Sequence, residues 1–525
     1  MKPLNALLRA GAVALLLCSA ALVPAHAATL VVAATKTPGG FDGDALKPNT
    51  QNVVVQVYEG LTKYGYRKSE KTGRMEIDPN KVLPHLAKKW TVSPDGKVYS
   101  IELRQGVKSP FGNELTAVDV VWGWEKSIAQ KRTGAFIAKA AGVVKVEVQD
   151  QYTVEFTLEA PSPIFLTALT LYTPSLYDST EVKKHATPDD PWALKWIDQN
   201  TAGFGAYQLQ SLKSGEEAVF VANPNYFAGK PYYDRVVYKE VPNAGTRFTL
   251  VRTGQVQWTE ELTLKQISEL KKDKRVKVES DQGTGHASVR MNPTIKPFDN
   301  ALLRQAISYA TDYKSLNLTV FENLGTQARS IVPPIIPGAD VTSWKFDTNL
   351  DKARQLVTQA GYPNGIDVTL EYASIFWFEE PIAIQMKDQL AKVGIRVKLQ
   401  KITDADMRSR TAPNKRDLAF FTFMDNPIVL DPLYALYLNA HSQGASNRNN
   451  YSSPEFDKLV DAARIEQNAA KRLDLVRKAQ QLHTADASWV MTMYPGAHEV
   501  MPPCMTGYVW QPDYHERWRE LSCKQ

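Results

Sequence analysis

The amino-acid sequence predicts a mixed α/β protein of two or three domains, and three observations support this. The chain has 525 residues, and the roughly 500 that follow a predicted leader exceed what one hydrophobic core supports. Strands and helices alternate in the C-terminal half, whereas strands with short helices dominate the N-terminal half. We find no low-complexity linker and no internal repeat, which favours lobes joined by chain crossovers.

The first 27 residues have the pattern of a secretory signal peptide. Lys2 and Arg9 supply positive charge, Ala10 to Val23 is apolar, and Ala25-His26-Ala27 fits the small-x-small cleavage pattern. The apolar run is about 14 residues long, against the roughly 20 that a membrane span requires. We therefore expect cleavage after Ala27 and export to the periplasm rather than a membrane anchor.

The mature chain is only mildly basic. Removal of Lys2 and Arg9 takes the 62 basic residues to 60 against 56 acidic residues, a net charge of +4. Charges of both signs are interspersed, so we expect no nucleic-acid partner. The densest basic run, Leu270 to Val278, is typical of a solvated helix end followed by a strand.

The three cysteines suggest one disulfide and no metal site. Cys18 lies in the leader and follows Leu17, where a lipid attachment signal needs a small residue. Cys504 and Cys523 remain in an exported chain, and we expect a disulfide between them that holds the C-terminal tail, worth about 3 kcal/mol. The sequence contains neither C-x-x-C nor H-E-x-x-H, so we expect no metal and no cofactor.

Local patterns predict the elements of the N-terminal half. Tyr99, Ile101 and Leu103 alternate with polar residues, as in a half-buried strand, and Pro94-Asp95-Gly96 makes a turn before them. Thr116 has the pattern of a helix N-cap with Asp119 completing a capping box. In chain order we expect strand Leu30–Ala34, helix Asn52–Leu61 leading into Tyr64–Arg67, hairpin Trp90–Val92 with Val98–Leu103, a helix after Thr116, strands Val143–Val148 and Thr153–Leu158, and further strands from Phe220 to Val241.

The C-terminal half contains a strand, a helix and a strand in close succession. Ile366, Val368 and Leu370 alternate, Glu380 to Val393 has apolar residues at helical spacing and stops at Gly394, and alternation resumes at Ile395. Short connections between these elements require a parallel pair with a right-handed crossover. We also expect a buried strand Leu418–Phe423, a helix opened by Ser453-Pro454, and a helix Lys471–Ala485.

Two ordered blocks of sequence carry a family resemblance. The first, residues 86–126, holds a Leu-Ala pair, Trp90, an Asp-Gly turn, Leu-Arg, Gly-Val-Lys and a Leu-Thr-Ala-x-Asp-Val helix start. The second joins Met291-Asn292 to Pro297-Phe298-Asp299 and to residues 303–312, LRQAISYATD. The chain resembles the extracellular solute-binding proteins of family 5, which serve dipeptide-, oligopeptide- and nickel-type ABC importers. Ser109, Pro110 and Phe111 depart from the family pattern at one loop tip.

The resemblance implies the two-lobed fold of periplasmic binding proteins (type II, cluster C), with an extra domain on the first lobe. By analogy the first lobe holds residues 28–58, 200–286 and 495–525, the extra domain holds residues 59–199, and the second lobe holds residues 287–494. It also implies a transport role: a monomer that holds a small-molecule or peptide ligand between its lobes and delivers it to an inner-membrane ABC permease with its ATPase subunits.

The same resemblance suggests which residues hold the ligand. Asp425 follows the Leu418–Phe423 strand, where dipeptide-binding relatives use an acidic residue for the ligand's α-ammonium. Arg410 lies ahead of that strand, where such relatives place an arginine for the ligand's carboxylate, with Arg408 and Arg416 as competing candidates. An Asp–Arg pair would suit a buried zwitterion, because each charge that leaves water needs a counter-charge.

Aromatic residues are expected to complete the pocket. Phe41 lies in a loop after the first strand, Trp377 in a loop after Ile366–Tyr372, and Phe423 stands where the family usually has tryptophan. Because family solutes range from peptides and glutathione to haem, opines, oligosaccharides and chelated nickel, the resemblance leaves the ligand open.

Two other functions remain open at this point. A periplasmic sensor or chaperone of the same fold is one, and an exported hydrolase is the other. We expect no enzyme activity, because the sequence lacks a G-x-S-x-G elbow, a P-loop and H-E-x-x-H.

Overall fold

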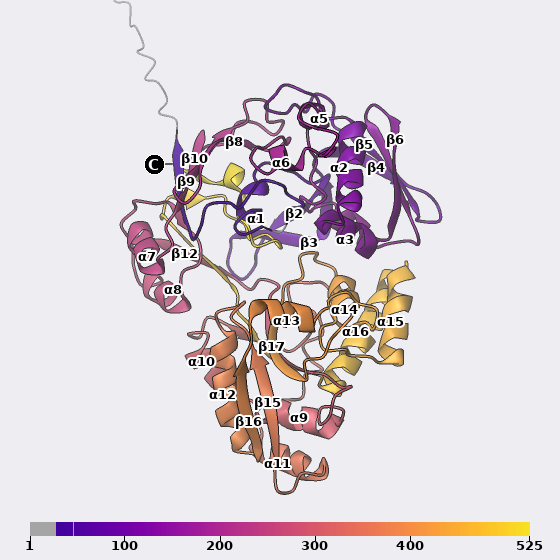
Figure 1. Ribbon diagram of the computed structural model, residues 1–525, viewed down its shortest axis with the longest axis vertical. Coiled ribbons are helices and arrows are strands. Elements are labelled where there is room, and N and C mark those ends of the chain that lie inside the picture. Colours follow the sequence, from indigo (N-terminus) through magenta and orange to yellow (C-terminus); the bar gives the residue numbers. More distant parts are fainter. Residues whose placement is uncertain (1–27, 46, 525) are drawn as a thin grey trace, which may run out of the picture.

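The computed structural model describes residues 28–45 and 47–524 and has two lobes (Figure 1). The predicted signal peptide, with Cys18, lies outside the described residues. The N-terminal part of the chain and the C-terminal tail form the first lobe, and the second lobe draws mainly on the later half of the sequence. The protein therefore has the expected two-lobed α/β architecture.

A five-stranded sheet forms the centre of the first lobe, in the order β11-β1-β10-β9-β8. β1 pairs in parallel with β10 and β11, and the other neighbours are antiparallel. The alternating burial of Leu30 and Val32 places their side chains in the lobe's core, where the rings of Phe220 and Trp518 also meet. The elements are β1 (Thr29–Ala34), α1 (Gln51–Val54), β8 (Tyr207–Lys213), β9 (Glu217–Ala222), β10 (Arg235–Glu240), α7 (Ala244–Arg252), β11 (Trp258–Thr259) and α8 (Leu264–Leu270).

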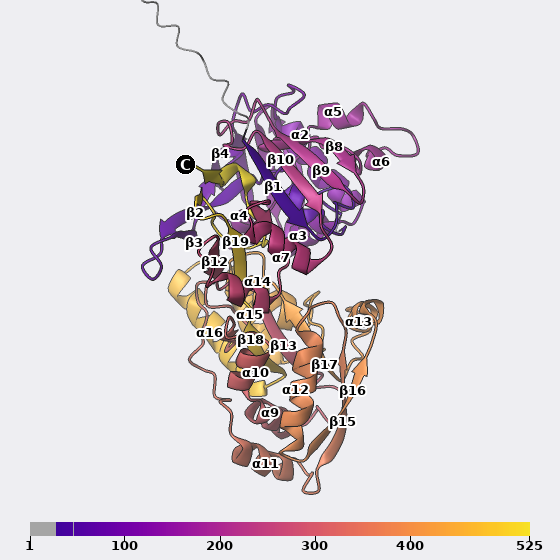
Figure 2. The same ribbon diagram turned by 90° about the vertical axis from the view of Figure 1, so that its left-hand side faces the viewer.

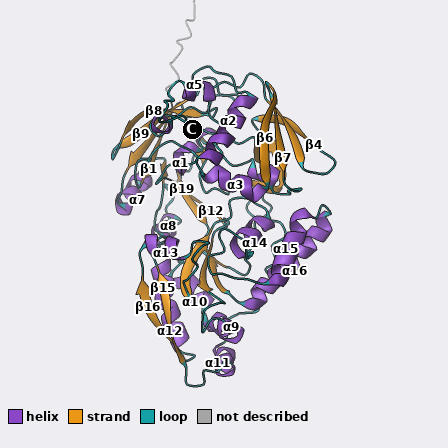
Figure 3. Ribbon diagram, turned by 45° about the vertical axis from the view of Figure 1, so that its right-hand side comes forward, coloured by secondary structure: helices purple, strands orange, loops and turns teal. Residues whose placement is uncertain are grey.

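A four-stranded antiparallel sheet, β4-β5-β7-β6, adjoins the first lobe. Helices α2 and α3 lie against this sheet (Figure 3). Thr116 and Asp119 form the predicted capping box at the start of α2, and the predicted hairpin is confirmed as β4 and β5. The elements are β2 (Thr62–Lys68), β3 (Met75–Pro84), β4 (Ala87–Val92), β5 (Val98–Leu103), α2 (Ala117–Ala129), α3 (Thr133–Ala141), β6 (Val143–Asp150), β7 (Thr153–Leu158), α4 (Phe165–Ala168), α5 (Ser179–Lys183) and α6 (Leu194–Ile197).

A six-stranded sheet, β14-β18-β13-β17-β15-β16, forms the second lobe. The predicted strand–helix–strand unit is confirmed: β15 and β16 are parallel and α12 connects them. Ser453 caps α15, as expected, by accepting a bond from the N–H of Phe456. The elements are β13 (His286–Met291), α9 (Ala301–Ala310), α10 (Tyr313–Thr319), β14 (Thr326–Gln327), α11 (Leu350–Gln359), β15 (Ile366–Tyr372), α12 (Glu379–Ala391), β16 (Ile395–Lys401), α13 (Asp404–Arg410), β17 (Phe420–Asp425), α14 (Pro432–Ala440), α15 (Pro454–Ile465), α16 (Ala469–Asp486) and β18 (Trp489–Tyr494).

A two-stranded ribbon lies between the lobes. β12 (Lys277–Asp281) leads into the second lobe and β19 (Ala497–Met501) returns from it, and the two strands pair antiparallel (Figure 2). Arg74, in the turn between β2 and β3, contacts carboxylate oxygens of Glu279 at 2.6 Å and Asp281 at 3.0 Å. These paired crossovers are the connection that a hinge requires.

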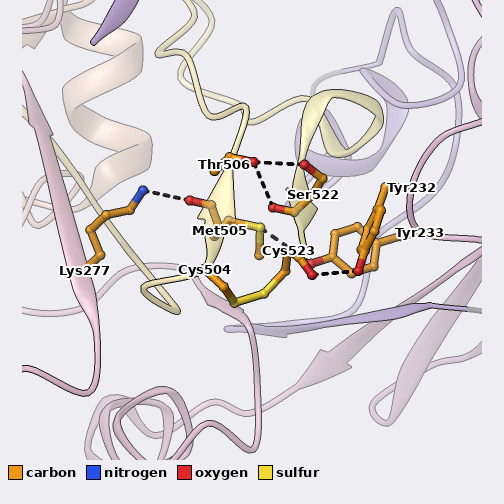
Figure 4. Close-up of a disulfide and its surroundings, with 8 residues drawn as sticks. All are labelled: Tyr232, Tyr233, Lys277, Cys504, Met505, Thr506, Ser522 and Cys523. Carbon is orange, nitrogen blue, oxygen red and sulfur yellow. Dashed lines mark hydrogen bonds between the residues drawn. A yellow bond between two sulfur atoms is a disulfide. The ribbon is translucent and has the colours of Figure 1, made fainter. Parts of the chain in front are cut away.

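The C-terminal tail returns to the first lobe and is cross-linked there. The predicted disulfide joins Cys504 to Cys523, with a Cα–Cα distance of 4.9 Å, beside the short strands β20 (Met505–Thr506) and β21 (Ser522–Cys523) (Figure 4). The Tyr232 hydroxyl donates to the carbonyl of Cys523 at 2.6 Å. Near its end the tail includes a 3₁₀ turn, Trp518–Glu520, whose tryptophan is fully buried.

Two predicted elements differ from the structure. The helix expected over Asn52–Leu61 is only α1, Gln51–Val54; β-branched Val53 to Val55 and Gly60 disfavour its continuation. The strand expected over Leu418–Phe423 is displaced by two residues and runs from Phe420 to Asp425. Asp425 is therefore the last residue of a buried strand rather than a loop residue, which fixes its position more tightly.

Candidate functional site

The candidate site lies where two parallel strands of the second lobe end. β15 and β17 are neighbours and run parallel, with Glu371 opposite Phe421, so the loops that follow them leave the same edge of the sheet. The loop after β17 reaches the region beside the first lobe, because the N–H of Leu430 donates to the hydroxyl of Tyr64 on β2 at 2.9 Å. Ligands of open α/β sheets bind at this kind of edge.

A cavity of about 410 Å³ opens at this edge. Its walls come from both halves of the molecule: Phe136 belongs to α3 beside the first lobe, and the other lining residues belong to the second lobe. The second lobe contributes Phe376 after β15, Phe423 and Asp425 on β17, Arg408 on α13 and Arg448 after α14. The volume is within the range of about 300–1,000 Å³ that is usual for ligand pockets.

A second cavity of about 630 Å³ adjoins the first. Phe136, Tyr434 and Leu438 line both cavities. The second cavity lies between the four-stranded-sheet region and helices α14 and α15, and aromatic and aliphatic side chains such as Tyr437 and Ile164 line much of it. The adjoining cavity has a larger apolar share than the first, and its four charged lining residues are two basic and two acidic: Lys139, Arg464, Glu159 and Asp461.

Asp425 is paired with a buried arginine of the neighbouring strand. β13 is antiparallel to β17 and places Arg290 within reach, so that its Nη2 donates to Asp425 Oδ2. Arg290 is fully buried, and Asp425 is 8% exposed. The Arg290 guanidinium also lies 3.8 Å from the centre of the Trp489 ring and donates from Nε to Ser288 at 3.2 Å. A buried guanidinium needs a counter-charge, and Asp425 supplies it.

Arg448 reaches the cavity with few partners of its own. Its guanidinium carbon lies 4.5 Å from the centre of the Phe423 ring, and its Nη1 is 3.5 Å from the Thr411 hydroxyl. Its Nε is buried and has no hydrogen-bond partner among the described residues. Burial lowers the pKa of Arg448, and the neighbouring charge of Arg408 lowers it further, although Asp425 opposes them. An arginine remains charged under such shifts.

Two buried histidines behind Arg290 are electrically neutral. Burial lowers the pKa of His286 to about 4. Burial, with the charge of Arg290 and the proximity of His286, lowers the pKa of His483 to about 3. Neither ring nitrogen of His286 has a hydrogen-bond partner among the described residues. At neutral pH these rings therefore fill space without changing the charge balance.

The structure brings together two of the five residues expected to contact ligand. Phe423 and Asp425 line the cavity side by side on β17. Arg410 does not line it, because its guanidinium is bound by Glu371 and by Asp417, the latter at 2.7 Å. Arg408, which the sequence offered as a competing candidate, is the arginine of α13 that lines the cavity.

The other two expected contacts lie elsewhere. Phe41 is fully buried in the first lobe's core, 6.1 Å from the Phe220 ring centre, because its loop folds back against the sheet. Trp377 is 55% exposed and packs against Phe321 and Phe378, while its neighbour Phe376 lines the cavity. The aromatic loop after β15 is therefore at the site, but through the preceding residue.

Sequence reasoning missed Arg290 and Arg448. No local signal marked Arg290, because His286, Ser288 and Arg290 alternate with apolar residues as on the solvent side of a half-buried strand, whereas the structure buries all six residues of β13. Arg448 lies in the loop segment SNRNN, which has no periodicity that would assign it a direction.

The described residues contain no group of three or more His, Cys, Asp or Glu placed to hold a metal ion. No helix within the described ranges, 28–45 and 47–524, is long and apolar enough to cross a membrane.

Comparison with known proteins gives consistent results. Residues 81–447 match the sequence profile described as bacterial extracellular solute-binding proteins, family 5 Middle. The chain is 26% identical over 521 residues to heme-binding protein A of Haemophilus influenzae, covering 94% of this chain and 92% of that protein. It is 28% identical over 480 residues to the probable D,D-dipeptide-binding periplasmic protein DdpA of Escherichia coli, covering 90% of this chain and 91% of the relative.

A solved structure shares the fold. HbpA2 from Haemophilus parasuis superposes with a TM-score of 0.82 at 24% sequence identity, over 95% of this chain and 100% of that one.

Proposed function

The chain belongs to the bacterial extracellular solute-binding proteins of family 5, and on that basis we propose that it captures a small solute in the cavity between its lobes. The solute is a short peptide or an amino-acid derivative, and the protein delivers it from the periplasm to an inner-membrane ABC permease and its ATPase subunits. Relatives named as heme-, D,D-dipeptide- and dipeptide-binding proteins support the class of function.

One observation carries this proposal: a cavity of ligand size is walled by both halves of the molecule and contains a cation, Arg448, that makes no ion pair with any described residue. A solute in this position touches α3 on one side and β17 on the other, so it favours the closed arrangement of the lobes over an open one. Binding and closure are then coupled through the β12–β19 ribbon, because a ligand shifts an equilibrium only by its differential affinity for the two states.

The proposal also states which residues move together and that the protein does not alter the solute. Residues 28–58, 200–286 and 495–525 move as the first lobe together with the extra domain, residues 59–199, and residues 287–494 move as the second lobe. The solute leaves the protein chemically unchanged, since the family consists of substrate-binding proteins.

Native mass spectrometry of protein purified from the periplasm tests the proposal. We expect a bound small molecule that is released on denaturation. Adding the recovered solute back to stripped protein is expected to reduce the radius of gyration measured by small-angle scattering.

Two results would count against this function. An unchanged scattering profile at saturating recovered solute would remove the clamp mechanism. A recovered solute whose mass changes on incubation with the protein would favour the exported hydrolase instead.

A further inference from the structure

The charged groups at the sheet edge of the cavity do not balance. Arg290, Arg408 and Arg448 bring three guanidinium groups to this edge, and among the described residues Asp425 is the single carboxylate that lines the cavity. Asp425 and Arg290 neutralise each other across β17 and β13. The remaining charge in the cavity wall is therefore positive.

Asp425 is not free to serve as a counter-ion for a ligand's ammonium group. Arg290 is fully buried and has no other carboxylate partner among the described residues. Transferring the charge of Asp425 to a ligand would leave a buried guanidinium unpaired, which is strongly unfavourable. A ligand ammonium would also enter beside Arg448 and Arg408, where like charges repel it.

Arg448 and Arg408 lack the partners that Arg290 has. Neither makes an ion pair with any described residue, in contrast to Arg410 two positions further on, which is held by two carboxylates. Phe423 covers one face of the Arg448 guanidinium. The Nε of Arg448 is shielded from water and has no hydrogen-bond acceptor among the described residues. A carboxylate that accepts hydrogen bonds from such an unpaired guanidinium forms a stronger interaction with it than a neutral acceptor does.

Nearby acidic groups do not cancel this positive charge. Glu379, behind Phe376, is fully buried and accepts from the N–H of Phe376 at 3.1 Å, and burial raises its pKa to about 7. Asp404, at the start of α13, accepts from the N–H of Ser374 at 3.3 Å and does not line the cavity. The neutral rings of His286 and His483 add no charge at pH 7.

We propose that the cavity selects its solute by an anionic group, a carboxylate that accepts from both Arg448 and Arg408, and that Asp425 positions Arg290 rather than binding an ammonium. The apolar part of the solute extends past Tyr434 into the adjoining cavity of about 630 Å³. This inference rests on the proposed function, because it names the chemistry of the solute that the same site takes.

Four versions of one dipeptide test the inference. Alanyl-phenylalanine carries both end charges, its N-acetyl form keeps only the carboxylate, its C-terminal amide keeps only the ammonium, and the doubly blocked form keeps neither. Calorimetric titration into stripped full-length mature protein should show that removing the carboxylate weakens binding about ten- to a hundredfold, whereas acetylating the amine has a smaller effect.

Arginine variants show which residues bind the carboxylate of the dipeptide. Arg448→Gln and, separately, the exposed Arg408→Gln should each weaken binding of the N-acetyl dipeptide by about tenfold or more and leave the already weak binding of the amide unchanged. Arg354→Gln is the matched control, since Arg354 is an exposed arginine on α11 that contacts Asp351 at 2.8 Å, away from the cavity. A melting curve for each variant separates loss of binding from loss of folding.

Each outcome decides the inference. If the amide binds as well as the free dipeptide and acetylation abolishes binding, the inference is overturned while the proposed function stands. If none of the four compounds binds, the solute recovered from the periplasmic protein decides: a recovered solute with an acidic group supports the inference and one without it overturns it. If no solute is recovered either, both the inference and the proposed function fail.

Discussion

Replacing Asp425 by asparagine is expected to destabilise the second lobe, because the change leaves a buried positive charge without a counter-ion. Arg290 is fully buried, and Asp425 is its single carboxylate partner among the described residues. Removing one member of a buried ion pair typically destabilises a protein by about 3–5 kcal/mol. In a lobe of this size, each kcal/mol of lost stability lowers the melting temperature by about 2–4 °C. The expected fall is therefore on the order of 10 °C.

A second substitution should restore most of this stability. In the double variant Asp425→Asn with Arg290→Met the buried charge is absent, and an apolar chain of similar length fills the space over Trp489. Buried ion pairs replaced by well-packed apolar residues are often neutral in stability. The double variant should therefore melt closer to the unmodified protein than either single variant does.

Differential scanning calorimetry of the solute-free protein measures these differences, and hydrogen exchange of the β13 and β17 amides shows whether they arise at this sheet. Asp367→Asn is the matched control, since Asp367 is an exposed aspartate of β15 that contacts Arg396 at 2.7 Å on the surface, and its transition should not change. A melting temperature for Asp425→Asn within 2 °C of the unmodified protein would refute the reasoning, because about 3 kcal/mol cannot produce so small a shift.

Three further predictions concern stability. Replacing Cys504 and Cys523 by serine should lower the free energy of unfolding by about 3 kcal/mol, since the disulfide closes a separation of 19 residues. Calorimetry with and without reductant checks this prediction, and an unchanged unfolding transition would contradict it. Because the folded pKa of His483 is about 3 and the unfolded value about 6.5, the unfolded state binds protons first and stability is lost as pH falls from 6.5 towards 3. His483→Leu should therefore reduce the difference in unfolding free energy between pH 7 and pH 5 by about 2 kcal/mol in urea titrations, and an identical pH dependence would exclude this assignment. Lys126→Met should destabilise the first lobe by about 3–5 kcal/mol, because fully buried Lys126 is 2.8 Å from Asp42 and the change leaves that carboxylate without its counter-charge. Unaltered melting and proteolysis of the variant would show that this ion pair is not needed for stability.

Local signals made much of the fold predictable. The hairpin at residues 87–103 follows from alternation and an Asp-Gly turn, and the capping box at Thr116 depends on residues three positions apart. The β15–α12–β16 unit follows from its periodicity and short connections. The disulfide was predictable for a different reason, since two of the three cysteines lie outside the predicted leader.

The site was only partly predictable, because its members come from distant parts of the chain. Asp425 and Phe423 were found through the family resemblance, near the end of a predicted strand, whereas Arg290 is 135 residues away from its partner Asp425. Arg408 and Arg410 lie on the same short helix, and the sequence could not show that Glu371 and Asp417 bind the second of them. Phe41 was expected to contact ligand from the loop after the first strand, but its side chain is fully buried in the first lobe's core.

The order of residues alone therefore specified most strands and helices and the disulfide, because these depend on neighbours in the chain or on the number of cysteines, and two ordered sequence blocks indicated the class of protein by their family resemblance. Only the packed lobes decided which charges face one another: Arg290 takes Asp425, Glu371 and Asp417 take Arg410, and Arg448 is left over the Phe423 ring. Charge pairing acts over a few ångströms in space and is independent of separation along the chain, so the polarity of the cavity emerges only when the strands are assembled.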